Sequence, residues 1–152
     1  MRVITFCAAM LLAMPAAAAN VYDFAATTPQ LSIFAQKMRQ TGIDRALANP
    51  GPYTIFAPTD AAAAKLSPSL DRETLVQILT CHMAPTEVVS RALASGQSAV
   101  IRTVGGCRLT LTRTPSGLTL KDDAGRSHRI EAADLDQANG VVHIVDSLIL
   151  PR

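Results

Sequence analysis

The residues best suited to chemistry are three histidines and two cysteines, all of which follow residue 80. They are His82, His128, His143, Cys81 and Cys107. Imidazole and thiolate groups bind zinc, and they also serve as acids, bases and nucleophiles. No two of the histidines share the short spacing of a zinc-binding motif, and neither cysteine belongs to a C-x-x-C pair. We therefore expect no metal ligand and no redox enzyme.

Acidic residues supply two further candidates, and neither favours a metal site. The segment 134–140 superficially resembles a calcium loop, but Ala138 and Val145 stand where the fifth and twelfth loop positions need oxygen ligands. Asp122 and Asp123 fit the solvated tip of a hairpin. The sequence also lacks G-x-S-x-G, H-E-x-x-H and phosphate-binding glycine loops. We expect no catalytic residue, no cofactor and no enzyme.

Basic residues gather in the second half of the chain. They are Arg102, Arg108, Arg113, Lys121, Arg126 and Arg129. They fit either a basic face for an anionic partner or, as we prefer, the outward positions of alternating strands. No aromatic residue follows Phe56, so the second half offers no stacking platform for sugars or single-stranded nucleic acid. The formal net charge of +2 is too balanced to indicate a nucleic-acid partner.

Residues 1–19 have the layout of a cleaved export signal. Arg2 is the basic start, Val3 to Met14 is the apolar run, and Ala17 to Ala19 supply small residues for cleavage after Ala19. The run is shorter than the roughly 20 residues of a membrane-spanning helix. We expect the mature protein, residues 20–152, to be secreted or periplasmic and to contain no membrane span.

Cleavage of the signal would remove Cys7 and leave two cysteines. Export bears on these two, because exported proteins mature in an oxidising compartment. Cys81 and Cys107 are separated by 26 positions. A disulfide between them is the preferred interpretation, and two buried free thiols are the alternative.

The mature chain divides into a helical half and a strand-rich half. Apolar spacing and capping residues predict helices after Pro29, at 43–47, at 61–66, after Asp71 and from Thr86 to Gly96. Strands are predicted at 53–57, 98–104, 108–113, 118–121, 127–131 and 141–149. Helices followed by paired short strands indicate a single α+β domain with one core.

Two segments carry a resemblance to a known family. Residues 51–60, GPYTIFAPTD, resemble the first signature of the fasciclin (FAS1) family, and residues 139–151, NGVVHIVDSLILP, resemble the second. Cys81-His82 falls where this family usually has a Tyr-His pair. The resemblance covers essentially all of the mature chain.

The resemblance implies a wedge of short strands with helices packed around it, in which the two signatures form neighbouring central strands. Family members are typically secreted or surface-attached, and they serve in adhesion without catalytic machinery. The residues that carry the resemblance are Thr54, Phe56, Ala57, Pro58, Thr59, Asp60, His82, Asn139, Gly140, Val141, His143, Val145 and Asp146.

We expect these signature residues to serve architecture. Thr59 and Asp60 can cap the helix that follows them. Asn139-Gly140 suits a turn with positive φ at the start of the last strand. His82 is expected to hydrogen-bond near the first signature and to lock a helix end to the sheet.

The sequence therefore predicts an exported, non-enzymatic binding or adhesion module that contacts a protein or a glycan outside the cytoplasm. A periplasmic protein that binds a small ligand is the alternative, and it would need a largely apolar pocket.

Overall fold

A computed structural model of the chain describes residues 18–152. The predicted signal peptide at 1–19 therefore lies almost wholly outside the described residues. None of the helices within 18–152 is long and apolar enough to cross a membrane.

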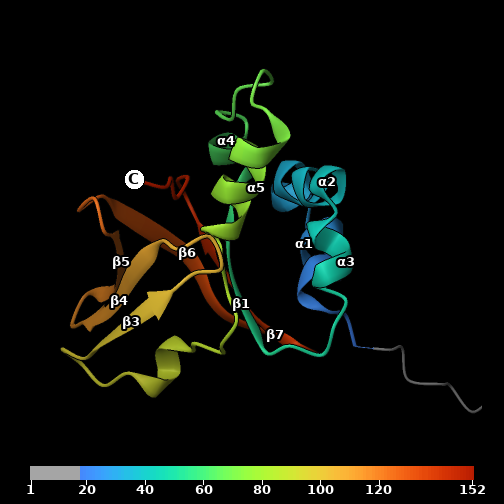
Figure 1. Cartoon of the computed structure of the whole chain (residues 1–152). Coiled ribbons are helices and arrows are strands. Elements are labelled where there is room, and N and C mark those ends of the chain that lie inside the picture. Colours follow the sequence, from blue (N-terminus) through green and yellow to red (C-terminus); the bar gives the residue numbers. More distant parts are fainter. Residues whose placement is uncertain (1–17) are drawn as a thin grey trace, which may run out of the picture.

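The structure is built on one seven-stranded sheet with helices packed against part of it (Figure 1), so the predicted α+β class is confirmed. The strand order is β2-β1-β7-β6-β5-β4-β3. The strands are β1 (Tyr53–Pro58), β2 (Met83–Ala84), β3 (Ser98–Arg102), β4 (Arg108–Thr114), β5 (Gly117–Asp122), β6 (Ser127–Gln137) and β7 (Gly140–Val145). The helices are α1 (Val21–Thr27), α2 (Ser32–Thr41), α3 (Ile43–Ala46), α4 (Asp60–Ala63) and α5 (Arg72–Thr80), with 3-10 turns η1 (Pro29–Leu31) and η2 (Ser90–Ala92).

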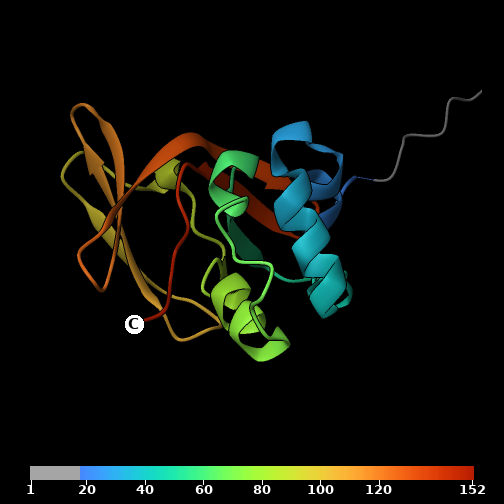
Figure 2. The ribbon, with the colours of Figure 1, turned by 90° about the horizontal axis from the view of Figure 1, so that it is seen from above.

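Strands β1 and β7 are parallel neighbours at the centre of the molecule, with Thr54 opposite Val141 and Phe56 opposite His143. Both strands are almost fully buried, which explains why each is mostly apolar, with Thr54 in β1 and His143 in β7 as buried polar residues. Their alternate side chains enter two separate apolar clusters. Figure 2 shows helices on one side of this pair and the outer hairpins on the other. The prediction of a single core is therefore wrong.

The first cluster lies between the helices and the β1–β7 pair. Ile55 and Ala57 of β1 and Val142 and Ile144 of β7 pack there against residues of α1, α2 and α3. The second cluster lies inside the wedge. It contains Phe56, Cys81, Ala84, Ile101, Cys107, Leu109, Leu111, Leu120, Val145 and Ile149.

Strand β6 joins the two arms of the wedge. Its first residues pair with β5, and the rest pair with β7 across two register shifts, between Ile130 and Ala132 and between Ala132 and Leu135. Such irregularities bend a strand and increase its twist. β6 is consequently longer than the predicted 127–131, because the bend lets it continue along β7.

Two local predictions differ from the structure, and one helix was not predicted. The unpredicted helix is α1, whose N-cap Asn20 accepts a hydrogen bond from the Asp23 amide at 2.8 Å. The last strand ends at Val145. The helix predicted from Thr86 to Gly96 is wrong: this segment is irregular, with one 3-10 turn at Ser90–Ala92 flanked by the extended residues Val89 and Leu93.

Candidate functional site

Residues 86–91, which we call the strap, cross the wedge side of the central strands and are held there by side chains. Thr54 on β1 donates from Oγ1 to the Thr86 carbonyl at 2.6 Å and accepts from the Val88 amide at 2.8 Å. These bonds give the Thr86 carbonyl and the Val88 amide partners on β1, and this tertiary pairing overrides the local preference for the predicted helix.

His143 on β7 holds the same segment from the next strand. Its Nε2 donates to the Val88 carbonyl at 2.7 Å, and its Nδ1 accepts from the Asp134 amide at 3.1 Å. The ring also stacks on Phe56, with centroids 5.2 Å apart. Burial lowers the pKa of His143. The imidazole therefore stays neutral and acts as a fixed donor and acceptor.

Asp134 on β6 completes the attachment of the strap. Its carboxylate accepts from the Ser90 amide and hydroxyl, each at 2.7 Å, and from the Arg91 amide at 3.0 Å. Burial acts to raise the pKa of Asp134, but these hydrogen bonds outweigh it and the net pKa is lowered. Asp134 has a φ of 57°, an uncommon conformation for a residue other than glycine. Three neighbouring strands thus each give one polar side chain to the strap.

His82 connects the end of α5 to the segment after β7. Its Nδ1 donates to the Ile78 carbonyl at 2.9 Å, and its Nε2 accepts from the Ile149 amide at 3.0 Å. Burial lowers the pKa of His82 from 6.5 to about 4. The side chain reaches the second signature, whereas the expected bond was near the first. The first signature is reached by the backbone, since the His82 carbonyl accepts from the Phe56 amide at 2.8 Å.

Cys81 and Cys107 form a disulfide inside the second apolar cluster, with their Cα atoms 5.3 Å apart. The bond ties the end of α5 to the residue that precedes β4. Together with His82, it fixes the α5 terminus to both arms of the wedge.

Asn139 and Gly140 serve close packing, and the predicted turn with positive φ is wrong because neither residue has a positive φ. The Asn139 side chain donates to the carbonyls of Leu47 and Asn49 at 2.7 and 2.9 Å and accepts from the Val21 amide at 2.9 Å. A Cβ on Gly140 would lie 2.0 Å from the Tyr53 carbonyl oxygen. Glycine is therefore required by the approach of two backbones.

Thr59 and Asp60 differ from their predicted roles as caps of the following helix. Thr59 is the N-cap of α4, but its side chain makes no capping bond. Asp60 instead accepts from the Ile33 amide at 2.8 Å and the Ser32 hydroxyl at 2.7 Å, at the start of α2. The first signature thereby anchors a helix that lies earlier in the chain. Asp146, in the second signature, accepts from the Arg129 amide on β6 at 3.0 Å.

One arrangement was not foreseen from the sequence. Nδ1 of His128 forms a hydrogen bond of 2.7 Å with the Ser147 hydroxyl. Nε2 of the same ring lies 3.2 Å from a carboxylate oxygen of Asp122. Asp122 is buried, so its prediction as a solvated hairpin residue is wrong. Its carboxylate also accepts from Arg126 Nε at 2.7 Å. Burial acts to raise the pKa of Asp122, yet the bonds from Arg126 and His128 outweigh it and lower the pKa.

The order of groups in this arrangement is that of a serine–histidine–aspartate triad. The residues are 19 and 6 positions apart in the sequence, without a motif that links them. In the structure they join the β5–β6 turn to the segment after β7. The same turn is fixed a second time, because Arg126 Nη2 donates to the Leu150 carbonyl at 2.7 Å.

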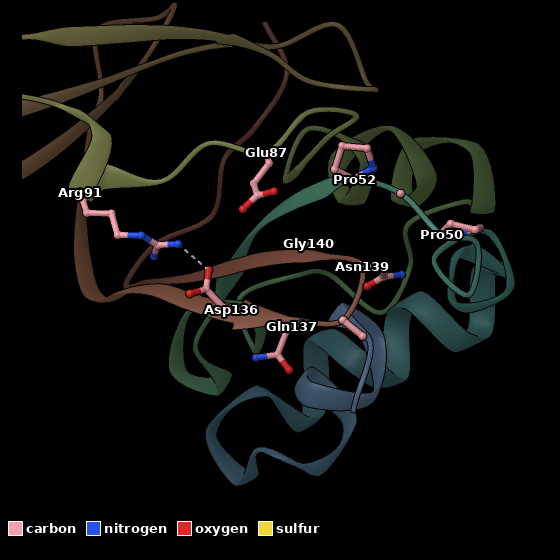
Figure 3. A pocket seen from close by; sticks show the side chains of 10 residues that line it. Pro50, Pro52, Glu87, Arg91, Asp136, Gln137, Asn139 and Gly140 are labelled. Carbon is pink, nitrogen blue, oxygen red and sulfur yellow. Dashed lines mark hydrogen bonds and ion pairs between the residues drawn. The ribbon is translucent and has the colours of Figure 1, made fainter. Parts of the chain in front are cut away.

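An open pocket of about 370 Å³ lies beside the strap, where both signatures begin (Figure 3). Its lining consists of Pro50, Gly51, Pro52, Glu87, Arg91, Asp136, Gln137, Ala138, Asn139 and Gly140. Arg91 and Asp136 form an ion pair across it at 3.1 Å. Half of these residues are polar or charged and none is a large apolar residue, unlike the lining of the apolar pockets that hold small molecules.

Within residues 18–152, no three His, Cys, Asp or Glu side chains come together in a way that could hold a metal ion.

Taken together, the parallel signature strands, the wedge and the helices packed on one side define a small α+β domain. The family model described as "Fasciclin domain" matches residues 29–151, and the chain belongs to this family. The family suggested by the two signatures is therefore confirmed.

Relatives with similar sequences include bacterial and animal proteins. Protein sll1483 of Synechocystis sp. is 29% identical over 144 residues, which cover 88% of this chain and 74% of the relative. Immunogenic protein MPB70 of Mycobacterium bovis is 32% identical over 108 residues, covering 68% of this chain and 52% of that protein. Human periostin is 27% identical over 128 residues, which are 80% of this chain but 15% of periostin.

The fold also matches a solved structure, a FAS1 domain pair from the insect cell adhesion molecule fasciclin I. The match has a TM-score of 0.68 and 17% identity, and it covers 87% of this chain and 51% of the other. At this level of identity the match shows the fold.

Proposed function

We propose that this chain is an exported, non-enzymatic binding or adhesion module that contacts a protein or a glycan outside the cytoplasm through its outer surface. The observation that carries the proposal is the use of the buried polar side chains. Four of these side chains form hydrogen bonds with backbone groups of the chain itself: Thr54, His82, Asn139 and His143. What remains for recognition is the exposed surface.

Two further observations support the proposal. The export signal predicted at 1–19 agrees with the disulfide of Cys81 and Cys107, because disulfides persist in oxidising compartments. The solved structure with the same fold belongs to a cell adhesion molecule.

Binding of a small ligand in the periplasm is less well supported. The pocket beside the strap is open and is crossed by the Arg91–Asp136 ion pair, so it lacks the enclosed apolar lining that would bury a small molecule.

Expression of the full chain in a bacterial host tests export and binding together. Mass spectrometry of the periplasm and medium is expected to find a protein that begins at Asn20. Beads coated with this processed protein are then incubated with an extracellular extract, and each recovered macromolecule is purified and tested for direct binding. Recovery of a metabolite without a macromolecule would favour the small-ligand alternative.

The Asp122–His128–Ser147 arrangement allows the non-enzymatic part of the proposal to be tested separately. A hydrolase would need a reactive Ser147 hydroxyl beside a cleft and an oxyanion hole. We expect a fluorophosphonate probe to label the wild-type protein no more than the Ser147→Ala variant. Stoichiometric labelling of Ser147 in the wild type would overturn the proposal.

A further inference from the structure

One cation stands on the outer face of each of four consecutive strands. They are Arg102 on β3, Arg108 on β4, Lys121 on β5 and Arg129 on β6, and all four are exposed. Arg102 lies directly opposite Arg108, Lys121 opposite Thr110, and Arg129 opposite Thr119. Opposite residues, and residues two apart along a strand, share one face of a sheet. The four cations, which we call the basic stripe, therefore share a single face.

The other face of the same strands is buried. Ile101, Leu109, Leu111 and Leu120 alternate with the residues of the stripe and pack into the second apolar cluster. The arm formed by β3 to β6, whose strands Figure 1 labels, therefore has an apolar side toward the wedge and a basic side toward solvent.

The charges of the stripe are not used within the fold. Among residues 18–152, no carboxylate oxygen lies within 4.0 Å of their charged nitrogens. The two other arginines of this half are used differently: Arg113 donates to the Ser90 carbonyl at 2.8 Å, and Arg126 pairs with Asp122. The sequence pattern did not distinguish the six cations. In the structure, two of them bond to other parts of the chain, and the other four point to solvent.

The position of the stripe also argues against a stabilising role. Like charges directly opposite each other weaken a strand pair, as Arg102 and Arg108 must. Three acidic residues adjoin the stripe: Asp123 follows Lys121, Glu131 follows Arg129, and the Asp146 carboxylate accepts from the Arg129 amide at 3.0 Å. The four cations outnumber these carboxylates, so the local surface is positive although the whole chain is nearly neutral.

The dimensions of the stripe follow from the strand registers. From Arg102 to Arg129 it crosses three strand spacings and shifts by four residues along the strands. With spacings of about 4.8 Å and a rise of about 3.4 Å per residue, the stripe is about 20 Å long. Its cations are thus arranged in a line.

The surface between the cations shows which partner fits. Hydroxyl groups lie beside the cations, on Thr110, Thr119 and Ser127. One large apolar residue on these strands is exposed, Val100 on the edge strand β3. A protein interface usually needs an apolar or aromatic centre, and single-stranded nucleic acid needs aromatic stacking. Neither is present on this face. A polysaccharide with repeated anionic groups fits this surface, because its charges match the line of cations and its hydroxyl groups can bond to the threonine and serine hydroxyls.

We propose that the basic stripe binds a linear polysaccharide that carries carboxylate or sulfate groups. This inference rests on the proposed function and names the class of partner. Arg102, Arg108, Lys121 and Arg129 pair with successive anionic groups, while the threonine and serine hydroxyls bond between them. The attraction acts between exposed charges and is therefore screened by salt.

The test measures binding of a size-defined heparin oligosaccharide to the processed protein by calorimetry, at about 50 mM and about 300 mM salt. The double variant Arg108→Ser/Lys121→Ser is compared with Arg45→Ser/Lys65→Ser, which removes two exposed cations from the helical half. We expect the stripe variant to bind about tenfold more weakly at low salt and the control variant to match the wild type. Melting temperatures of both variants should equal or exceed that of the wild type.

Three outcomes overturn the inference: no binding of heparin, equal losses in the two double variants, or tighter binding of polyglutamate, which would indicate an acidic protein partner. Any of these would leave the proposed function standing if the processed protein still binds a purified surface macromolecule. Labelling of Ser147 by the fluorophosphonate probe would instead remove the proposed function, so the two failures are distinguishable.

Discussion

The amide of Ile149 donates a hydrogen bond to Nε2 of His82, which lies 67 positions earlier in the chain, at a distance of 3.0 Å. The same ring donates from Nδ1 to Ile78, so it must carry one proton and keep Nε2 free as an acceptor. A second proton on the ring would remove this link between α5 and the segment after β7.

Acid is therefore expected to destabilise the protein through His82. The folded pKa is about 4 and the ordinary value is 6.5, so the unfolded chain binds a proton that the folded protein excludes between these values. This stabilisation is fully present above pH 6.5 and is lost as the pH falls towards 4, by up to about 3 kcal/mol. Urea unfolding at several pH values measures it.

The variant His82→Gln supplies the control for this effect, because its carbonyl oxygen can accept from Ile149 without titrating. Its free energy of unfolding should change less with pH in this window than that of the wild type. The remaining dependence is expected from His143, whose pKa burial also lowers. An identical pH dependence in the two proteins would show that His82 does not titrate as described.

Removal of the Thr54 hydroxyl should loosen the strap. Thr54→Val keeps the shape of the side chain but leaves the Thr86 carbonyl and the Val88 amide without their partner. We expect a loss of about 1–3 kcal/mol in the free energy of unfolding and faster hydrogen exchange at the Val88 amide. Thr119→Val, at an exposed strand position, should stay within about 0.5 kcal/mol of the wild type. Equal effects of both substitutions would contradict the assignment.

Two adjacent signature residues should differ in their effect on stability. Asp60→Ala removes the acceptor at the start of α2 and is expected to cost about 1 kcal/mol. Thr59→Ala should cost less than about 0.5 kcal/mol, since the Thr59 side chain makes no capping bond. Chemical denaturation measures the loss of stability in each variant. A larger loss for Thr59→Ala than for Asp60→Ala would contradict the prediction, because it would indicate that Thr59 caps α4.

The disulfide is expected to contribute strongly to stability. Replacement of Cys81 and Cys107 by alanine opens a loop with a sequence separation of 26, which in the chain-entropy model costs roughly 3 kcal/mol. A reducing agent should lower the melting temperature of the wild type and leave the double variant unchanged. A wild-type melting temperature that does not respond to full reduction would refute the prediction.

Local patterns predicted the elements whose partners are nearby. The apolar spacing around Phe34 and Met38 predicts α2, and Asp71 caps α5 as expected, with the Thr74 amide at 2.8 Å. Strand β1 was equally clear, because a short β-rich run is closed by Pro58. These elements are specified by residues within one or two turns.

The strap could not be predicted in this way. Thr86 and Glu87 have the local character of a helix start, but Thr54, Asp134 and His143 lie 32 to 55 positions away from the backbone groups they bind. Their hydrogen bonds override local preference, and only the folded chain brings them together. The basic stripe has the same origin, since it depends on the registers of four strands.

The position of β1 and β7 between two apolar clusters links the two halves of the molecule energetically. Loss of either cluster would expose one side of both strands to water, so neither half can melt at small cost while the other persists. The tyrosines at 22 and 53 contact the helical cluster, whereas the disulfide lies in the other. Tyrosine fluorescence and circular dichroism should therefore follow one shared unfolding transition.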